Sequence, residues 1–232
     1  MRIMKFGITI EKSRIIKFDI KKIENLKNAV DCYDSSKLES APKTDRELFD
    51  YFLSNTDKVY NGLRNLLNMS GLVVDNEIRA MLGHILDIDI NNSNDINLEK
   101  AYGHFRRLNI DIFKIICDEF DKFYNDWLNK HYKYDFRNVK GNFLKEFAVI
   151  YYHAKKYYTI AQLNERTGSD RMHHSVLSDY SKAAGEYIKM VYFYLQYRNE
   201  IERVKHCTDV KRICSYIFDA FCVITSLLSF IK

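Results

Sequence analysis

The sequence predicts an all-α fold: an antiparallel bundle dominated by three long helices, with a small β-hairpin or an extended arm at the N-terminus. The chain of 232 residues holds one proline and eight glycines, whereas average usage would give roughly a dozen prolines. Strand-and-turn architectures use both residues as punctuation, so their scarcity indicates long helices with few corners. Apolar residues also recur at helical spacing over three long stretches.

The N-terminal residues 1–43 are interpreted as an appendage and linker. Two short β-branched stretches, MKFGITI and RIIKFDI, are typical of a hairpin or an extended arm. Residues 21–33 have a helical pattern, and residues 34–44 gather Ser, Pro and Asp in the clearest linker of the chain.

The bundle itself is predicted to cover residues 44–212. Thr44 caps its first helix and Glu47 completes a capping box, so this helix is expected to run from Thr44 to about Met69. A shorter helix follows over roughly residues 75–86. Helical periodicity then predicts the three long helices, over about 97–134, 139–163 and 173–205. Helices of this length with short connectors pack as an antiparallel bundle.

The C-terminal residues 213–232 form a separate apolar helix in this interpretation. Residues 213–231 are a 19-residue, mostly apolar run between Arg212 and Lys232, and roughly 20 apolar residues span a bilayer. However, Asp219 would cost about 2.5–3.5 kcal/mol near the centre of a membrane helix. We therefore expect a buried core helix, with a membrane anchor as the alternative.

Cysteine usage and the N-terminus indicate a cytoplasmic location, with the cytoplasmic face of a membrane as the alternative. The five cysteines are scattered and have no CxxC spacing, which does not fit a disulfide framework. The basic start MRIMKFGITIEKSR lacks an apolar core of signal-peptide length. Cys207, Cys214 and Cys222 recur at close to two helical turns and are predicted to lie on one buried face.

No motif indicates a metal or a cofactor, and we expect neither. Residues 87–99 have the acidic spacing of a calcium loop, but Asn92 replaces its glycine and Leu98 its bidentate glutamate. This segment is therefore interpreted as a polar, helix-capping loop. Histidines and cysteines lack zinc spacing, and no glycine-rich phosphate loop is present.

Charge is uneven along the chain. Residues 130–232 hold 17 Lys/Arg and 10 Asp/Glu, which gives +7, while residues 1–129 carry −2 of the total of +5. Eleven of the 17 tyrosines lie between Tyr132 and Tyr197. A basic, tyrosine-rich half suits RNA or another phosphate-bearing ligand, because lysines meet phosphates and aromatic rings stack on bases. The alternative is an ordinary solvated helix face with half-buried tyrosines.

The stretch RTGSDRMHHS, residues 166–175, is the strongest candidate for chemistry. It joins two predicted long helices and brings Arg166, Arg171, His173 and His174 together. Side chains that straddle a loop and a helix start can converge on an anion, because free backbone N–H groups point there. The alternative is a polar connector.

The spacing of Arg166 and His173, with six residues between them, resembles the R-x4–6-H signature of HEPN proteins. These are helical ribonucleases and RNA-binding modules common in bacterial toxin and antiphage defence systems. The resemblance implies a metal-independent ribonuclease that acts as a homodimer. In such a site, His173 would move a proton and Arg166 would stabilise the phosphate in the transition state.

Two other arginines partly fit this signature. Arg79 and His84 have four residues between them, but both lie inside one apolar-patterned helix, where a structural histidine is expected. Arg198 is followed by Asn199, like the family's usual polar residue, and is a further ligand-binding candidate. Its histidine, His206, stands one residue too far along the chain.

A second candidate site is a polar row in the segment AYGHFRRLNIDIFK. His104, Arg107 and Asp111 are three and four residues apart, so they share one helix face, and Lys114 continues the row. The row could bind a ligand, but an intrahelical salt-bridge ladder is the preferred interpretation.

Three functions follow from these patterns. The first is an RNA-directed, HEPN-like protein of a bacterial defence or toxin-type system, acting as a nuclease or as a binder. The second is a non-enzymatic helical protein that works as a homodimer or in a protein complex. The third is a membrane-associated protein anchored by its C-terminal helix.

Overall fold

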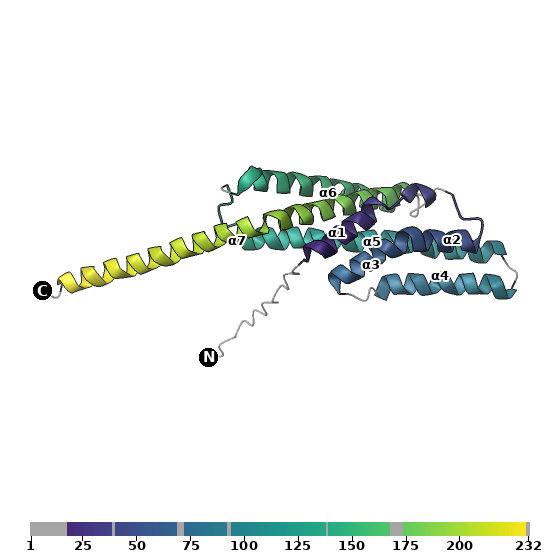
Figure 1. Cartoon of the computed structure of the whole chain (residues 1–232), viewed down its shortest axis with the longest axis horizontal. Coiled ribbons are helices and arrows are strands. Elements are labelled where there is room, and N and C mark those ends of the chain that lie inside the picture. The colour runs from purple at the N-terminus through teal and green to yellow at the C-terminus, as the bar shows by residue number, and fades with distance from the viewer. Residues whose placement is uncertain are drawn as a thin grey trace, which may run out of the picture.

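The computed structural model describes residues 18–38, 40–68, 72–91, 94–137, 139–167 and 174–230, and these residues form helices and their connections, without strands (Figure 1). The all-α prediction is therefore confirmed. The α-helices are α1 (Ile20–Asp31), α2 (Asp45–Tyr51), α3 (Asp57–Leu67), α4 (Leu72–Asn91), α5 (Asn94–His131), α6 (Phe143–Thr167) and α7 (His174–Phe230). Short turns are η1 (Ser35–Leu38), η3 (Lys140–Asn142) and the π-helical η2 (Phe52–Thr56).

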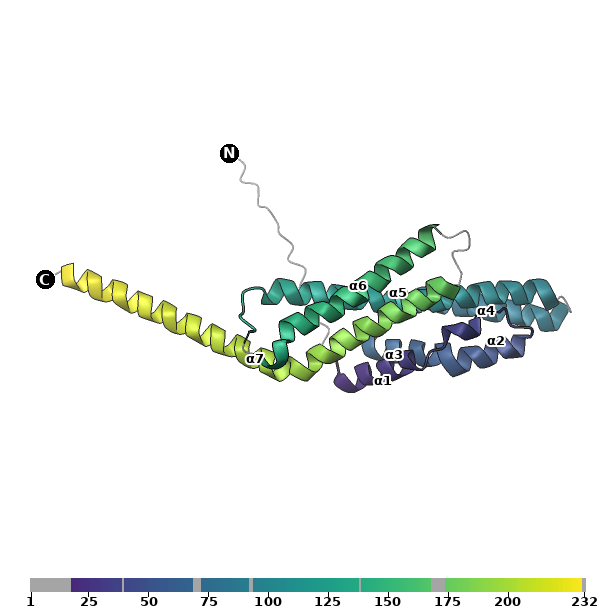
Figure 2. The same cartoon turned by 90° about the horizontal axis from the view of Figure 1, so that it is seen from above.

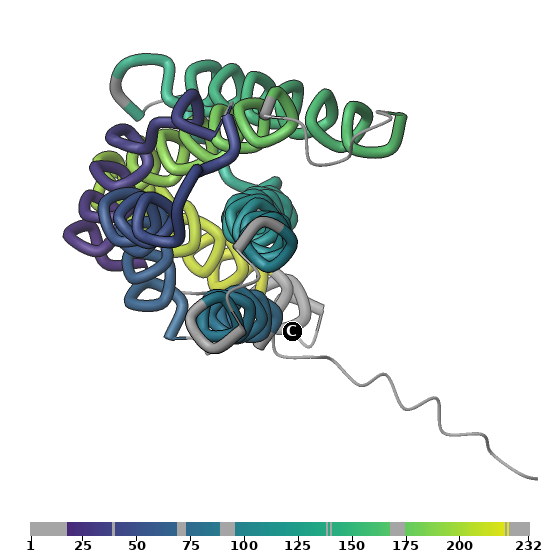
Figure 3. Tube along the Cα trace, turned by 90° about the vertical axis from the view of Figure 1, so that its right-hand side faces the viewer, coloured from purple at the N-terminus to yellow at the C-terminus, as the bar shows by residue number. Residues whose placement is uncertain are grey.

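The three long helices exist, and they are antiparallel to their neighbours in the chain. They are α5, α6 and α7, with 38, 25 and 57 residues. Figure 2 shows α6 lying along the first part of α7, with α5 beside them. Seen along the bundle in Figure 3, α5 lies between α4 and the α6–α7 pair, and α1 to α3 cover the flank.

Helix α5 is central because one stripe of it is apolar except for Asn109. Six of its side chains that are at most 1% exposed recur at helical spacing: Phe105, Leu108, Ile112, Phe113, Ile116 and Phe120. Apolar side chains three or four residues apart form one continuous face of a helix. This face gives the other helices a common surface on which to pack.

The expected N-terminal appendage is wrong for residues 18–38, because this segment belongs to the bundle core. Ile23 and Leu26 of α1 are fully buried, and Phe18 packs edge-to-face against Phe120 of α5 with ring centroids 5.3 Å apart. Helix α1 lies against α3 and α7. The hairpin expected before residue 20 falls almost entirely on residues 1–17, which lie outside the described residues.

The helix expected from Thr44 to Met69 is divided into α2 and α3 by the π-helical turn η2. Its start is as predicted: Thr44 Oγ1 accepts a hydrogen bond from the Glu47 backbone N–H at 3.1 Å. The Glu47 carboxylate accepts in return from the backbone N–H of Lys43 at 2.8 Å. Helix α3 ends at Asn68, whose left-handed φ of 51° closes the helix early.

A buried amide holds the π-helical turn against α5. Oδ1 of Asn109, which is 1% exposed, accepts hydrogen bonds from Thr56 Oγ1 at 2.7 Å and from Tyr33 Oη at 2.9 Å. Its Nδ2 donates to the Phe105 carbonyl at 2.8 Å. One side chain thereby ties the segment after α1, the turn η2 and helix α5 together.

The polar loop expected over residues 87–99 is largely helical. Helix α4 continues through Asn91, and α5 begins at Asn94. The two helices therefore form a tight antiparallel pair, and α4 packs chiefly on α5.

The expectation that residues 213–231 form a buried core helix is wrong for the side chains that the structure describes. Helix α7 runs without a break from the bundle to Phe230, and its far end projects beyond α5 (Figures 1 and 2). All eight side chains of residues 213–220 are exposed. Cys207, Cys214 and Cys222 are exposed as well. We name residues 213–230 the α7 overhang.

The physical reason is the length of the bundle. Helix α5 ends at His131, and the following turn supplies the last contacts to α7. Tyr134 donates a hydrogen bond to Asp209 at 3.1 Å, and the Arg212 guanidinium donates to the Lys133 carbonyl at 3.0 Å. Beyond this point α7 outruns the helices that could cover it. Counted over the described residues, no helix has an apolar stretch of the length needed to cross a membrane.

Replacing Asn109 tests the buried amide. Asn109→Leu should lower the free energy of unfolding by about 2–3 kcal/mol, because it removes the acceptor of the buried Thr56 hydroxyl and one hydrogen bond of Tyr33. Urea denaturation measures the change. Asn129→Ala, an exposed asparagine on the same helix, is the matched control and should stay near wild type. Equal stability of the two variants would contradict the role given to Asn109.

Candidate functional site

A row of polar side chains follows α5 beside its apolar stripe, and we name it the α5 polar seam. It consists of His104, Asp111, Lys114, Asp118 and Asp121, and it turns toward α4 at one end and toward α6 and α7 at the other. The predicted row of His104, Arg107, Asp111 and Lys114 is its first half. The expected intrahelical ladder is wrong, because His104 and Lys114 pair with Glu77 of α4 and Glu165 of α6 instead.

The α4 end of the seam holds two stacked imidazoles and a carboxylate. His104 Nδ1 lies 2.7 Å from Glu77 Oε2, and these side chains are 22% and 20% exposed. The His84 ring stacks on the His104 ring with centroids 5.3 Å apart and an interplanar angle of 22°. The buried Nδ1 of His84 has no hydrogen-bond partner among the described residues. The sequence predicts a structural role for His84, and no local pattern indicates that its ring meets His104, 20 residues along the chain.

The middle of the seam is Asp111, which is half-buried, while Arg107 is exposed. Burial raises the pKa of Asp111, and Glu77 and Glu165 act in the same direction, while Lys114 and Arg107 oppose them. Among the predicted ligand-binding residues, His104 and Asp111 thus share one partly buried polar environment, whereas Arg107 faces solvent.

The far end of the seam is a set of carboxylates surrounded by donors. Asp121 accepts hydrogen bonds from Tyr187 at 2.8 Å, Tyr151 at 3.1 Å and Lys155 at 2.9 Å. Tyr158 donates to Asp118 in the same way.

Glu165 of α6 completes this end. It accepts a hydrogen bond from Tyr180 of α7 at 2.6 Å and pairs with Lys114 of α5 at 2.5 Å. Three helices therefore meet on one carboxylate.

These tyrosines serve as hydrogen-bond donors across the physiological pH range. Burial, together with the Asp121 carboxylate, raises the pKa of Tyr151 to about 12. Burial and the neighbouring carboxylates raise the pKa values of Tyr158, Tyr180 and Tyr187 further. A phenol that keeps its proton does not act as a general base, and a carboxylate that accepts several donors is not free to act as one. The geometry therefore supports a structural role, in which these hydrogen bonds fix the packing of α5, α6 and α7.

The end of the bundle from which α7 emerges is an aromatic cluster around Trp127. Its indole stacks on His131 with centroids 5.0 Å apart and meets Phe147 and Phe143 edge-on. His131 Nδ1 lies 2.7 Å from the Trp127 carbonyl. Burial lowers the pKa of His131, since the charged imidazole would lose its hydration.

One small cavity lies between η1, α2 and α5. It has a volume of about 210 Å³ and is lined by Lys37, Lys43, Glu47, Tyr51 and Phe105, among others. Ligand pockets usually measure about 300–1,000 Å³, so this one is small for a cofactor. Among the described side chains, no group of three His, Cys, Asp or Glu could hold a metal ion.

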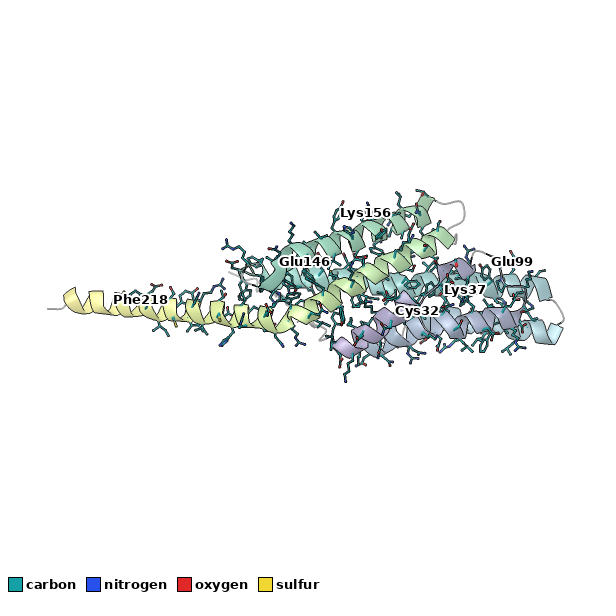
Figure 4. All side chains as sticks on the ribbon, turned by 45° about the horizontal axis from the view of Figure 1, so that its top comes forward. Cys32, Lys37, Glu99, Glu146, Lys156 and Phe218 are labelled. Atoms are coloured by element: carbon teal, nitrogen blue, oxygen red, sulfur yellow. The ribbon has the colours of Figure 1, made fainter. Side chains whose placement is uncertain are left out.

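The α7 overhang is the second candidate, and it is an apolar surface. Ile213 and Ile217 are 57% and 65% exposed, Tyr216 and Phe218 are 71% and 66% exposed, and Val210, just before the overhang, is 42% exposed. In Figure 4, the labelled Phe218 stands on a part of α7 with no other helix beside it.

Replacing Asp121 tests this structural role of the hydrogen bonds between α5, α6 and α7. Asp121→Ala should lower the free energy of unfolding by about 2–4 kcal/mol, because buried phenols lose a charged acceptor. Adding Tyr187→Phe should restore part of this loss, since the variant then buries no unpaired hydroxyl at that position. Chemical denaturation measures both variants, and Lys122→Ala, an exposed change on α5, is the control. An Asp121→Ala variant as stable as wild type would contradict the structural role given to these hydrogen bonds.

The buried imidazole makes the fold acid-sensitive. The unfolded chain protonates His131 at a higher pH than the folded chain does, so stability is lost as the pH falls below the unfolded value of about 6.5. His131→Asn, which can keep a donor near the Trp127 carbonyl, should lose less stability than wild type between pH 7 and pH 5. Denaturation at both pH values measures this difference. The exposed His153→Asn should keep the wild-type profile, and identical profiles for all three proteins would refute the prediction.

The residues that carry the HEPN resemblance are only partly described. Arg166 is exposed in the last turn of α6, and Arg198 is exposed on α7. His174 is the first residue of α7, while Arg171 and His173 lie outside the described residues. No protein-family model, curated protein sequence or solved structure matches the chain. The resemblance to HEPN proteins and the RNA-directed function that it implies therefore stay predictions.

Proposed function

We propose that the protein is a non-enzymatic interaction protein that binds another α-helix through the α7 overhang. The observation that carries this proposal is the exposure of every side chain from Ile213 to Ala220 on a helix that continues directly from the core. Contiguous apolar patches on a soluble surface mark sites of interaction with proteins or membranes.

The stability of the overhang supports the need for a partner. Most helical stability in proteins comes from packing an apolar face. In the 18-residue overhang, the side chains from Ile213 to Ala220 are exposed to solvent. A partner helix would supply the missing contacts and remove apolar surface from water.

The bundle is well suited to hold such a helix in a fixed direction. Tyr134 and the Lys133 carbonyl hold α7 at Asp209 and Arg212, immediately before the overhang. The α5 polar seam fixes α7 further back through Tyr180 and the Asp121 acceptor of Tyr187. The carboxylates and phenols of the seam are hydrogen-bonded to one another. They therefore hold α7 in position, and few of them are free to act as an acid or base in catalysis.

Site-specific photo-crosslinking in cells that express the full chain tests the proposal. A photoreactive residue at Ile217, on the apolar face, should form protein adducts. The same residue at Ser215, on the opposite face of the same turn, is the matched control and should form few. Equal adducts at both positions, or none at Ile217, would sink the proposal. Lipid adducts alone at Ile217 would replace it with membrane attachment.

A further inference from the structure

We infer that the helix that covers the overhang is the overhang of a second copy of this chain. The inference rests on the proposed function and names the partner that the proposal leaves open. Its basis is the three- and four-residue spacing of the exposed apolar side chains along α7, together with the uncharged residues Cys214 and Tyr216 in the flanking positions.

The exposed apolar side chains have the spacing of a helix that pairs with another helix. Val210, Ile213, Ile217 and Ala220 are separated by three, four and three residues, and the described side chains of Ile213–Ala220 are exposed. The sequence continues this alternation with Ile224, Leu227 and Ile231. Apolar residues that alternate three and four apart form the seam of a coiled coil.

Over Ile213–Ala220, the positions directly beside this seam carry no charge that would select a different chain, and the charged Asp209 beside Val210 already accepts a hydrogen bond from Tyr134. In coiled coils, partner choice is set largely by charged residues that flank the seam. Here the flanking residues Cys214 and Tyr216 are uncharged. Asp219 lies on the opposite face with Ser215, since the two residues are four apart. Two identical overhangs can therefore meet without like charges facing each other, whereas a charged partner helix would find no complement.

The size of the surface fits a reversible complex. A helix of 18 residues is roughly 27 Å long at about 1.5 Å per residue. Two such helices bury an area near the low end of specific interfaces, about 1,200 Å² in total. We therefore expect a dissociation constant on the order of micromolar. The overhang projects clear of its own bundle (Figures 1 and 2), so a second copy can reach it.

Sedimentation velocity of the purified full chain across a wide concentration range tests this inference. Wild type should pass from monomer to dimer or a larger self-assembly as its concentration rises. Ile213→Asp/Ile217→Asp should weaken association at least about 100-fold, because two carboxylates would have to be buried in the seam. Ser215→Asp, one added carboxylate on the opposite face, should associate like wild type. The melting temperature of all three bundles, measured at a concentration where the chain is monomeric, should be equal, which separates lost association from misfolding.

A chain that stays monomeric at all concentrations would overturn the inference. So would Ser215→Asp that weakens association as much as the double variant does. If the monomeric chain still forms adducts with a different protein at Ile217 in cells, the second-copy inference fails while the proposed function stands. If the monomeric chain instead binds vesicles of zwitterionic phospholipid and the double variant does not, both fail in favour of a membrane surface.

Discussion

The rest of the structure depends on α5 having two adjacent faces of opposite character. The apolar stripe, which runs from Phe105 through Ile112 to Phe120, removes enough surface from water to hold the other helices in place. Such burial is non-directional, so it does not select one register of neighbouring helices. The α5 polar seam does select it, because Asp121 accepts from Tyr187 and Lys155 in one relative position of the three helices. Stability and specificity thus come from neighbouring rows of the same helix.

The helices were largely predictable because each depends on local pattern. The three long segments have uninterrupted apolar periodicity, and Thr44 caps α2 as its sequence indicates. Their ends were less predictable. Helices α4 and α5 absorb most of an acidic segment that resembles a loop in composition, because a helix continues wherever packing rewards it and proline is missing. The π-helical turn η2 escaped prediction because it depends on the contact of Thr56 with Asn109, 53 residues away.

The candidate site shows the same division. The row that contains His104, Asp111 and Lys114 could be found from its spacing alone, since that spacing puts the three residues on one helix face. Its partners could not be found, because Glu77 and Glu165 come from other helices and no local pattern connects them with α5. The C-terminal segment failed for a related reason. Its hydrophobicity predicted a helix buried in the core of the same chain. This prediction was wrong, as the exposed Ile217 shows.

The unbroken course of α7 has a further consequence for distance. A helix of 57 residues has a contour length of about 85 Å at 1.5 Å per residue. Its first residue is His174, and its last residues form the overhang at the other end of the helix (Figure 1). Helix α7 therefore sets a fixed distance between its two ends. The first turn of α7 and the overhang are therefore held tens of ångströms apart. A deletion within α7 would shorten this distance. It would also rotate the overhang about the helix axis relative to the bundle.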